Sequence, residues 1–161
     1  MIEPWLEDSL QRFRGLDHLT SAEWGHVNHA AWLKEHLPGL GTCEFFAPAQ
    51  QDPALPVPLA DASVQLVLTL DFFETLRMDQ LYMVASEARR ICRPGGLWLL
   101  RGLNPGTNLW QRLMGRVHAG RTGERPLELT HYISPEDWNT LSDSRSREGL
   151  LSRQLLVLER L

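Results

Sequence analysis

Two strand-length apolar runs joined by one amphipathic helix constrain the fold of this chain more than any other feature. The runs are Val64–Leu70 and Leu97–Leu103, and apolar residues follow one another along both almost without interruption. Such continuity is typical of a strand covered on both faces, as in a parallel sheet between two layers of helices. Between them, Met78–Arg93 has apolar residues at three- and four-residue spacing, and a Pro-Gly-Gly sequence ends this helix. The arrangement predicts an α/β fold.

The remaining segments add further strands and helices to this prediction. The expected strands are 42–47, 64–70, 97–103 and 151–160, and the expected helices are 4–13, 21–37, 78–93, about 109–117 and 134–142. The helix over 21–37 depends on Thr20 and Glu23, which form the pattern of a capping box. We expect one domain over residues 1–161, in which a helical segment, 1–41, precedes a sheet core, 42–161. The predicted fold is α/β, a Rossmann-like three-layer sandwich with a reduced, mostly parallel sheet.

Charge and composition exclude several classes of partner. The formal net charge of −4 offers no positive field to nucleic acid, which is therefore not expected as a partner. No stretch approaches 18 continuous apolar residues, so no membrane span is expected. The first residues are acidic where a signal peptide needs basic ones, and the two cysteines, Cys43 and Cys92, form no CxxC pattern. These features predict a cytoplasmic protein with reduced thiols.

Three histidines form the one pattern that suggests a metal. His26, His29 and His36 would lie on the predicted helix 21–37, but no acidic or cysteine residue stands beside them at ligand spacing. We interpret them as part of a solvated helix face and predict no metal site.

Five short motifs occur in the order found in class I S-adenosylmethionine-dependent methyltransferases, and from about Pro58 to Leu141 the chain resembles the type 11 branch of that family. The most specific is EARRICRPGG at 87–96, which is similar to the family's REIxRVLRPGG. The others are PLADASVQLV at 58–67, similar to LPFxDxSFDLV; Phe73-Glu74 with Asp79, similar to LEH…D; Asn104-Pro105 with Leu109-Trp110, similar to NPxSLW; and HYISPE at 131–136, similar to xxFSPEEL. The resemblance covers about half of the chain.

The resemblance implies where a cofactor and a substrate would bind. By analogy with the family, Thr69, Leu70, Asp71 and Phe72 would line the methionine side of S-adenosylmethionine, and Asn104 would face a small-molecule substrate. Each assignment has a structural alternative. Asp71 and Phe72 would then be a loop acid and a core side chain, and Asn104 would cap the helix that follows it. No residue can be named as the catalytic base.

The chain departs from the family pattern in its first half. The family has a glycine-rich GxGxG turn after its first strand, where glycine lets the backbone approach the cofactor, and an acidic residue that ends the second strand and holds the ribose. The residues before Thr42 read as two helices, and Gly39-Leu40-Gly41 reads as a helix end followed by a turn. The C-terminus has room for one strand where the family has a hairpin. We therefore predict that the backbone cradle and the ribose anchor are absent.

Two functional hypotheses follow from this pattern. In the first, the chain is a methyltransferase-like pseudoenzyme that does not bind S-adenosylmethionine tightly and acts as a protein-interaction or regulatory subunit. In the second, it is an active methyltransferase on a small molecule, with an atypical cofactor site formed partly by the N-terminal helices. Without the first strands, one side of the 64–70 strand would be open. We expect segment 42–47 or a second chain to fill it, because open apolar edges pair.

Overall fold

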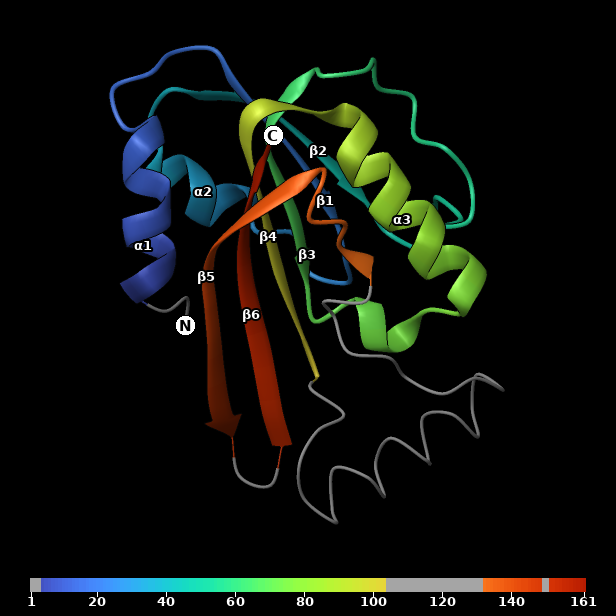
Figure 1. Cartoon of the computed structure of the whole chain (residues 1–161). Helices are drawn as coiled ribbons and strands as arrows, with labels where there is room; N and C mark the ends of the chain where they lie inside the picture. The colour runs from blue at the N-terminus through green and yellow to red at the C-terminus, as the bar shows by residue number, and fades with distance from the viewer. Residues whose placement is uncertain (1–3, 104–131, 149–150) are drawn as a thin grey trace.

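The computed structural model describes residues 4–103, 132–148 and 151–161 of the chain (Figure 1). Its strands are β1 (Leu19–Trp24), β2 (Leu40–Phe46), β3 (Val64–Leu70), β4 (Cys92–Leu103), β5 (Trp138–Glu148) and β6 (Leu151–Arg160). Its helices are α1 (Pro4–Leu10), α2 (Ala30–His36) and α3 (Met78–Ile91), with single 3-10 turns η1 (Gln11–Phe13) and η2 (Phe73–Thr75). No helix among these residues is long and apolar enough to cross a membrane.

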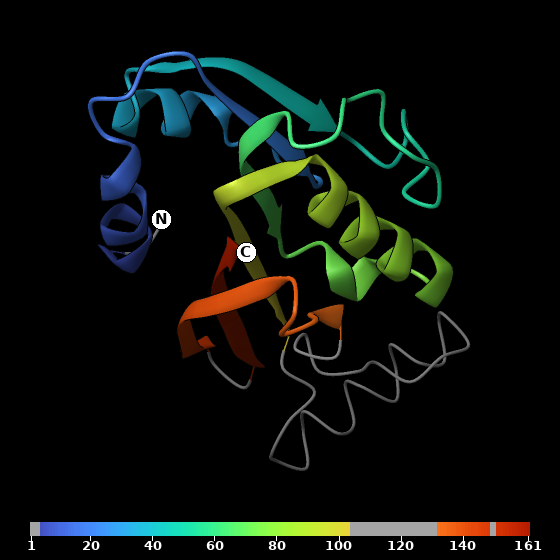
Figure 2. The ribbon, with the colours of Figure 1, turned by 45° about the horizontal axis from the view of Figure 1, so that its top comes forward.

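The strands form one six-stranded sheet in the order β2-β1-β3-β4-β6-β5. The first four in this order run parallel, whereas β6 is antiparallel to both β4 and β5. Helices α1 and α2 lie on one face of the sheet and α3 lies on the other (Figures 1 and 2). The predicted α/β, Rossmann-like three-layer sandwich with a mostly parallel sheet is therefore confirmed.

Each face of the sheet has its own apolar core. On one face Val84, Ala88 and Ile91 of α3 pack on a cluster that includes Trp24 and Trp98. On the other face, leucines of α1 and α2 and Phe13 of η1 pack on the leucines of β3 and β4. β3 and β4 contribute side chains to both cores, which explains why their sequences are almost continuously apolar.

The helix predicted over 21–37 is wrong in its first part, because residues 19–24 form strand β1. The two residues of the expected capping box have other partners. The Thr20 hydroxyl donates to Gln65 Oε1 at 2.7 Å, and the Glu23 carboxylate accepts the backbone N–H of His29 at 2.9 Å. The segment is enclosed between β2 and β3, and pairing with both strands outweighs its local helix signal. Only 30–36 is helical, so the segment 1–41 is not helical throughout.

The position of β1 also corrects the expected filling of the sheet. β1 pairs with β3 on the side that was predicted to be open, and β2 pairs with β1 rather than with β3. The strand predicted over 42–47 therefore exists, one position further out, and forms the edge of the sheet. The prediction that the first strands are missing is wrong.

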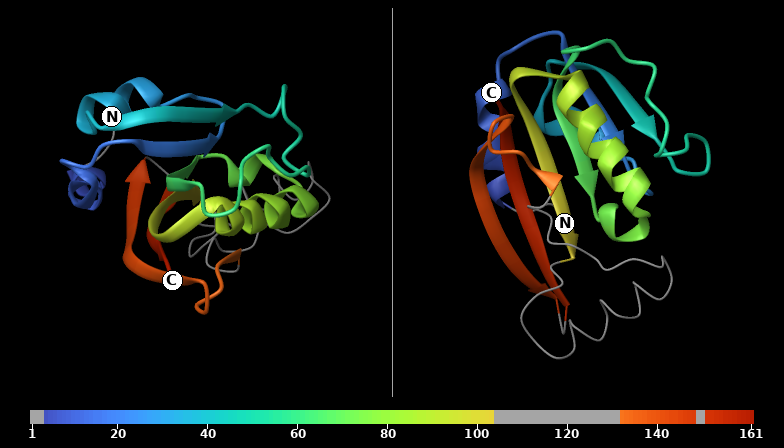
Figure 3. Two further views of the ribbon diagram at one scale, coloured as in Figure 1. Left: turned by 90° about the horizontal axis from the view of Figure 1, so that it is seen from above. Right: turned by 45° about the vertical axis from the view of Figure 1, so that its right-hand side comes forward.

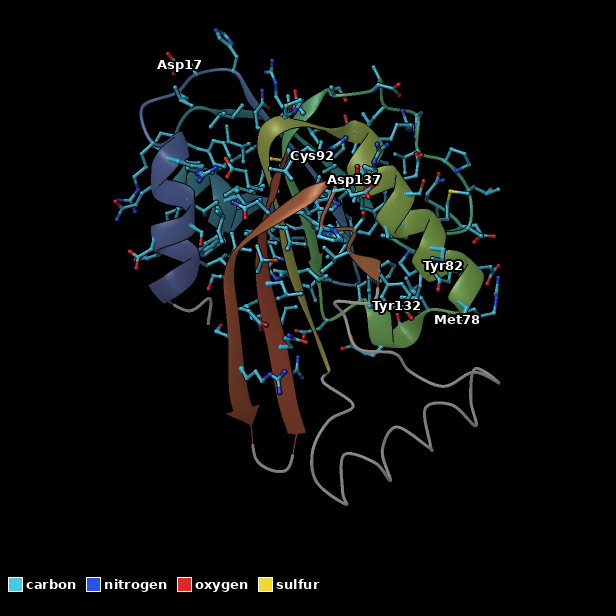
Figure 4. The ribbon with its side chains drawn as sticks, viewed as in Figure 1. Asp17, Met78, Tyr82, Cys92, Tyr132 and Asp137 are labelled. Carbon is cyan, nitrogen blue, oxygen red and sulfur yellow. The ribbon has the colours of Figure 1, made fainter. Side chains whose placement is uncertain are left out.

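The helix predicted over 134–142 is wrong as well, because Trp138–Glu148 forms strand β5. Ser134 starts only one turn, in which its carbonyl accepts the N–H groups of Asp137 and Trp138, both at 3.0 Å. The turn is held against α3, where the Tyr132 hydroxyl contacts Met78 Sδ at 3.3 Å and Asp137 pairs with Arg89 at 2.7 Å (Figure 4). β5 and β6 form the hairpin that the C-terminus was predicted to lack.

The other predicted elements agree with the structure or lie outside its described part. The helix over 78–93 is confirmed as α3, and the strands over 64–70, 97–103 and 151–160 are confirmed as β3, the later part of β4, and β6. The helix expected near 109–117 lies outside the described residues, as does Asn104.

Candidate functional site

The four parallel strands all have their carboxyl ends at the same end of the sheet, which is the lower end in Figure 1. In open α/β sheets, ligands bind at this carboxyl end of the strands, because the loops that leave the strands there form a crevice. The loops after β1, β2 and β3 are described, and the loop after β3 contains two of the four residues predicted to contact a cofactor, Asp71 and Phe72. The other two, Thr69 and Leu70, are the last residues of β3.

The loop after β1 reads Gly25-His26-Val27-Asn28-His29. A strand therefore does run into a glycine, contrary to the expectation from sequence. Against the pattern GxGxG, however, the second and third glycine positions hold Val27 and His29. The Gly25 N–H donates to the Phe46 carbonyl on β2 at 3.4 Å, so the first amide of the loop is used within the sheet.

The buried carboxylate of Glu23 binds His29, the last residue of this loop before helix α2. Glu23 is only 4% exposed. It accepts the backbone N–H of His29 at 2.9 Å, and its other oxygen lies 2.5 Å from His29 Nδ1. The next amide, that of Ala30, donates to the Asn28 side chain at 2.9 Å. Two N–H groups at the entrance of α2 are therefore satisfied by side chains, one by Glu23 of β1 and one by Asn28 of the loop.

His26 links the loops that follow β1 and β3. Its Nε2 lies 3.1 Å from the Thr75 hydroxyl, and its ring meets Phe72 edge-on with a centroid distance of 5.4 Å. The Thr75 hydroxyl gives its only proton to the Phe72 carbonyl at 2.7 Å. His26 Nε2 must therefore be the donor to Thr75, which sets the tautomer of the imidazole.

No acidic residue stands at the end of β2. The strand ends at Phe46 and continues into Ala47 and Pro48. The first carboxylate after it, Asp52, accepts the N–H of Ala54 at 2.9 Å and caps its own turn. The last residue of β2 and the residues directly after it carry no carboxylate, and the nearest one within the strand is the exposed Glu44, two residues before its end.

Three of the four residues predicted to contact the cofactor have buried side chains. Leu70 and Phe72 are 7% and 0% exposed and belong to the two apolar cores. Thr69 is also fully buried, and its hydroxyl accepts the indole N–H of Trp98 at 2.9 Å. The structure places these residues at the carboxyl end of β3, as expected, but their side chains are directed into the protein.

The fourth, Asp71, is held by two arginines. Its carboxylate accepts two hydrogen bonds from Arg101 on β4, at 2.6 and 3.0 Å, and Arg153 Nη1 on β6 lies 2.5 Å away. Asp71 has a left-handed backbone (φ 53°), and its N–H donates to the Arg101 carbonyl at 2.8 Å. Sequence reasoning assigned neither arginine to the site, although Arg101 is the single charge in the apolar run 97–103.

The most specific motif of the resemblance also has a structural role. Glu87 on α3 is 5% exposed and accepts two hydrogen bonds from Arg90, both at 2.7 Å, and the Val57 N–H at 2.9 Å. Arg90 in turn donates to the carbonyls of Val57 and Leu59. The Arg90 guanidinium, together with the Val57 N–H, lowers the pKa of Glu87. The pair fixes the loop that leads into β3.

The histidines do not form a ligand set. His26 and His29 lie in the loop after β1, and only His36 lies on α2, so they do not share one helix face as predicted. In the described part of the chain, no group of three or more His, Cys, Asp or Glu side chains is placed to hold a metal ion.

No family model and no curated protein matches the sequence. Solved structures do match. A SAM-dependent methyltransferase from Methanosarcina mazei has a TM-score of 0.71 at 12% identity, over 99% of this chain and 98% of that chain. The geranyl diphosphate C-methyltransferase from Streptomyces coelicolor A3(2), solved with Mg²⁺, geranyl diphosphate and S-adenosyl-L-homocysteine, has a TM-score of 0.62 at 10% identity, over 99% and 78% of the two chains.

A third similar structure is a complex that contains the Haloferax volcanii Trm112 methyltransferase activator. Its TM-score is 0.65 at 11% identity, over 96% of this chain and 88% of that chain. The similarity thus extends over almost the whole length of this chain, including the first half, at low sequence identity. The chain has the fold of the class I S-adenosylmethionine-dependent methyltransferases.

Proposed function

We propose that this chain is a methyltransferase-like domain that does not bind S-adenosylmethionine tightly and acts as a protein-interaction or regulatory subunit. The observation that carries the proposal is the loop after β1. A glycine-rich loop holds a nucleotide cofactor through free backbone N–H groups and the absence of side chains. Here the amides of Gly25, His29 and Ala30 already have acceptors within the protein, and the His26 side chain crosses to Thr75.

The end of β2 supports the same conclusion. A carboxylate that accepts hydrogen bonds from ribose contributes about 1.5–3 kcal/mol, and each neutral backbone bond contributes about 1 kcal/mol. The absence of the carboxylate and of two such backbone bonds would therefore weaken binding by about 4 kcal/mol, which is about three orders of magnitude in Kd. A cofactor held micromolar by a complete site would be held only millimolar by this one.

The test is calorimetric titration of the chain with S-adenosylmethionine and with S-adenosylhomocysteine. We expect no heat of binding at millimolar ligand. Dissociation constants in the micromolar range would contradict the proposal. A double variant, Val27→Gly with His29→Gly, gives the loop the GxGxG pattern and is expected to bind at least about tenfold more tightly than the wild type.

The second candidate is an active methyltransferase on a small molecule, with an atypical cofactor site. It is favoured by one observation: β1, the following loop, α2 and β2 are all present in the arrangement of the fold. Similar structures have been solved with this cofactor, among them geranyl diphosphate methyltransferase in complex with SAM. Micromolar binding in the same titration would favour this candidate, and the His26 side chain would then have to leave Thr75 to admit the ligand.

A further inference from the structure

Strand β2 is an edge strand without the usual protection. It is the outermost strand on its side of the sheet, and β1 is its only neighbour among the described strands (Figure 3). Its seven residues, LGTCEFF, contain one charge, Glu44, and neither lysine nor proline. Edge strands of soluble proteins are commonly protected by such residues, because unpaired backbone groups bind a further strand.

The opposite edge of the same sheet is protected. It is formed by β5, whose sequence WNTLSDSRSRE contains four charged residues, namely Asp143, Arg145, Arg147 and Glu148. The two edges therefore differ in charge density within one molecule. This contrast indicates that β2 is the edge available for pairing.

The backbone of β2 has free groups at defined residues. The Phe46 carbonyl faces β1, because it accepts the Gly25 N–H. Backbone groups of successive strand residues point to opposite sides, so those of Phe45 and Cys43 point away from β1. Thr42 and Glu44 have exposed side chains, and Cys43 is half-buried. No helix or strand among the described residues covers this row of donors and acceptors.

We propose that β2 pairs in antiparallel orientation with β2 of a second copy of this chain, about a two-fold axis at Cys43. In this register Cys43 lies opposite Cys43 of the partner subunit, and Glu44 lies opposite Thr42 of the partner subunit. The only charge of the strand therefore faces a hydroxyl and not its own copy, and Gly41 faces a Phe45 side chain. Because both halves of such an interface are the same surface, the register must be self-complementary, as it is here. The two sheets become one continuous sheet.

This inference rests on the proposed interaction role, because it names the surface through which that role would be exercised. The first measurement is light scattering coupled to size exclusion, without any ligand. We expect a mass about twice the 18.4 kDa of the chain, which decreases on dilution. A monomer at every concentration up to the solubility limit would overturn the inference. Since S-adenosylmethionine is not present, this result would leave the proposed weak cofactor binding intact.

The two cysteines allow the register itself to be tested. Opposed residues of an antiparallel pair have Cβ atoms about 4.5–5.5 Å apart, so a short thiol cross-linker such as dibromobimane should join Cys43 to Cys43 of the partner subunit. The other thiol, Cys92, is 1% exposed, and burial raises its pKa to about 12, so it should not react. Cys43→Ser should abolish the cross-link and keep the doubled mass.

A matched pair of charge variants completes the test. Cys43→Lys places two ammonium groups opposite each other at the axis and should shift the dimer dissociation constant upward by at least tenfold. Glu44→Lys adds a lysine one residue away, opposite Thr42, and should change it less than threefold. A dimer that does not cross-link at Cys43, or that responds equally to both lysines, would show that another surface pairs and would overturn the inference.

Discussion

Glu87 and Arg90 form a structural contact, and this contact explains why their motif is typical of the fold. The two residues are in the most specific motif of the resemblance, yet they bind the loop at 57–61 and not a ligand position. A buried carboxylate with three protein donors is well satisfied, and replacing it with a neutral amide leaves the guanidinium with only the exposed carboxylate of Asp61 as counter-charge. The contact stabilises the folded protein and does not depend on a cofactor.

Glu87→Gln is therefore expected to lower the free energy of unfolding by about 2 kcal/mol at pH 7. Because the pKa of Glu87 is lowered in the folded state, its stabilisation is complete above the ordinary value of 4.5 and is lost as the pH falls through the lowered pKa. The difference between variant and wild type in urea unfolding should thus shrink below pH 4.5. Glu35→Gln, at an exposed position of α2, should change stability by less than about 0.5 kcal/mol at any pH. A pH-independent difference for Glu87→Gln would contradict this assignment.

Thr69 offers a second test at the residue scale, since sequence reasoning assigned it to the cofactor. Thr69→Val removes the acceptor of the Trp98 indole N–H and should cost about 1–3 kcal/mol of unfolding free energy. In a Trp98→Phe background, which has no indole N–H, the same substitution should cost close to nothing. A double-mutant cycle by urea unfolding measures this coupling. If Thr69→Val instead altered a heat of cofactor binding and left stability unchanged, the structural role would be wrong.

At the scale of elements, the turn between α2 and β2 makes a close backbone contact, at Gly39, with the segment that leads into β1. A Cβ atom at Gly39 would lie 1.7 Å from the Leu16 carbonyl oxygen, whereas a Cβ at Gly41 would have nothing closer than 3.7 Å. Neither glycine has a positive φ, so the requirement at Gly39 is one of space. The sequence predicted a helix end and a turn at these glycines, and α2 does end just before them. It did not predict that the backbone at Leu16 lies against Gly39.

Gly39→Ala should therefore destabilise the protein by about 3 kcal/mol, because backbone atoms must move to admit the methyl group. Gly41→Ala, two residues further along the chain and inside β2, should change the free energy of unfolding by less than about 1 kcal/mol. Thermal unfolding followed by circular dichroism compares the two variants directly. Equal losses at the two positions would show that the close contact with Leu16 is not maintained in solution.

The strands that sequence reasoning found are those whose residues carry their own signal. β3, β6 and the later part of β4 are apolar enough to be recognised alone. β1 and β5 are not, since LTSAEW and WNTLSDSRSRE are polar and lie next to helix-start patterns at Thr20 and Ser134. Both form strands because a neighbouring strand supplies their hydrogen bonds, and that information is not local. The candidate site was misjudged for the same reason, because finding the loop at Gly25 required knowing that a strand precedes it.

At the scale of the whole molecule, the two cysteines lie at positions of very different accessibility. Cys43 is on the edge strand, whereas Cys92 lies at the start of β4 beneath the end of α3 (Figure 4). The thiol of Cys92 belongs to the core between the sheet and α3. Its environment excludes water, and this exclusion raises its pKa to about 12. Exposure of this thiol requires the two layers to separate.

We expect one of the two thiols to react rapidly with Ellman's reagent at pH 8 under native conditions, and both to react in concentrated denaturant. The reaction rate of Cys92 should decrease in proportion to the equilibrium constant for global unfolding when stabilising salts are added. Cys43→Ser leaves Cys92 as the only thiol and isolates the slow reaction. A Cys92 that reacts as fast as Cys43 would show that the layers open locally without unfolding.

The position of β6 has a consequence for how the protein is made. β6 lies between β4 and β5, although both precede it in the chain. During translation, β5 therefore cannot join the sheet until β6 has left the ribosome. Until then, the side of β4 that will pair with β6 stays open along Leu97, Leu99 and Leu100. A nascent chain that stalls before residue 151 would present this apolar edge to other chains and to chaperones. The rate at which the last ten residues of the sheet emerge thus sets how long each new molecule stays prone to aggregation.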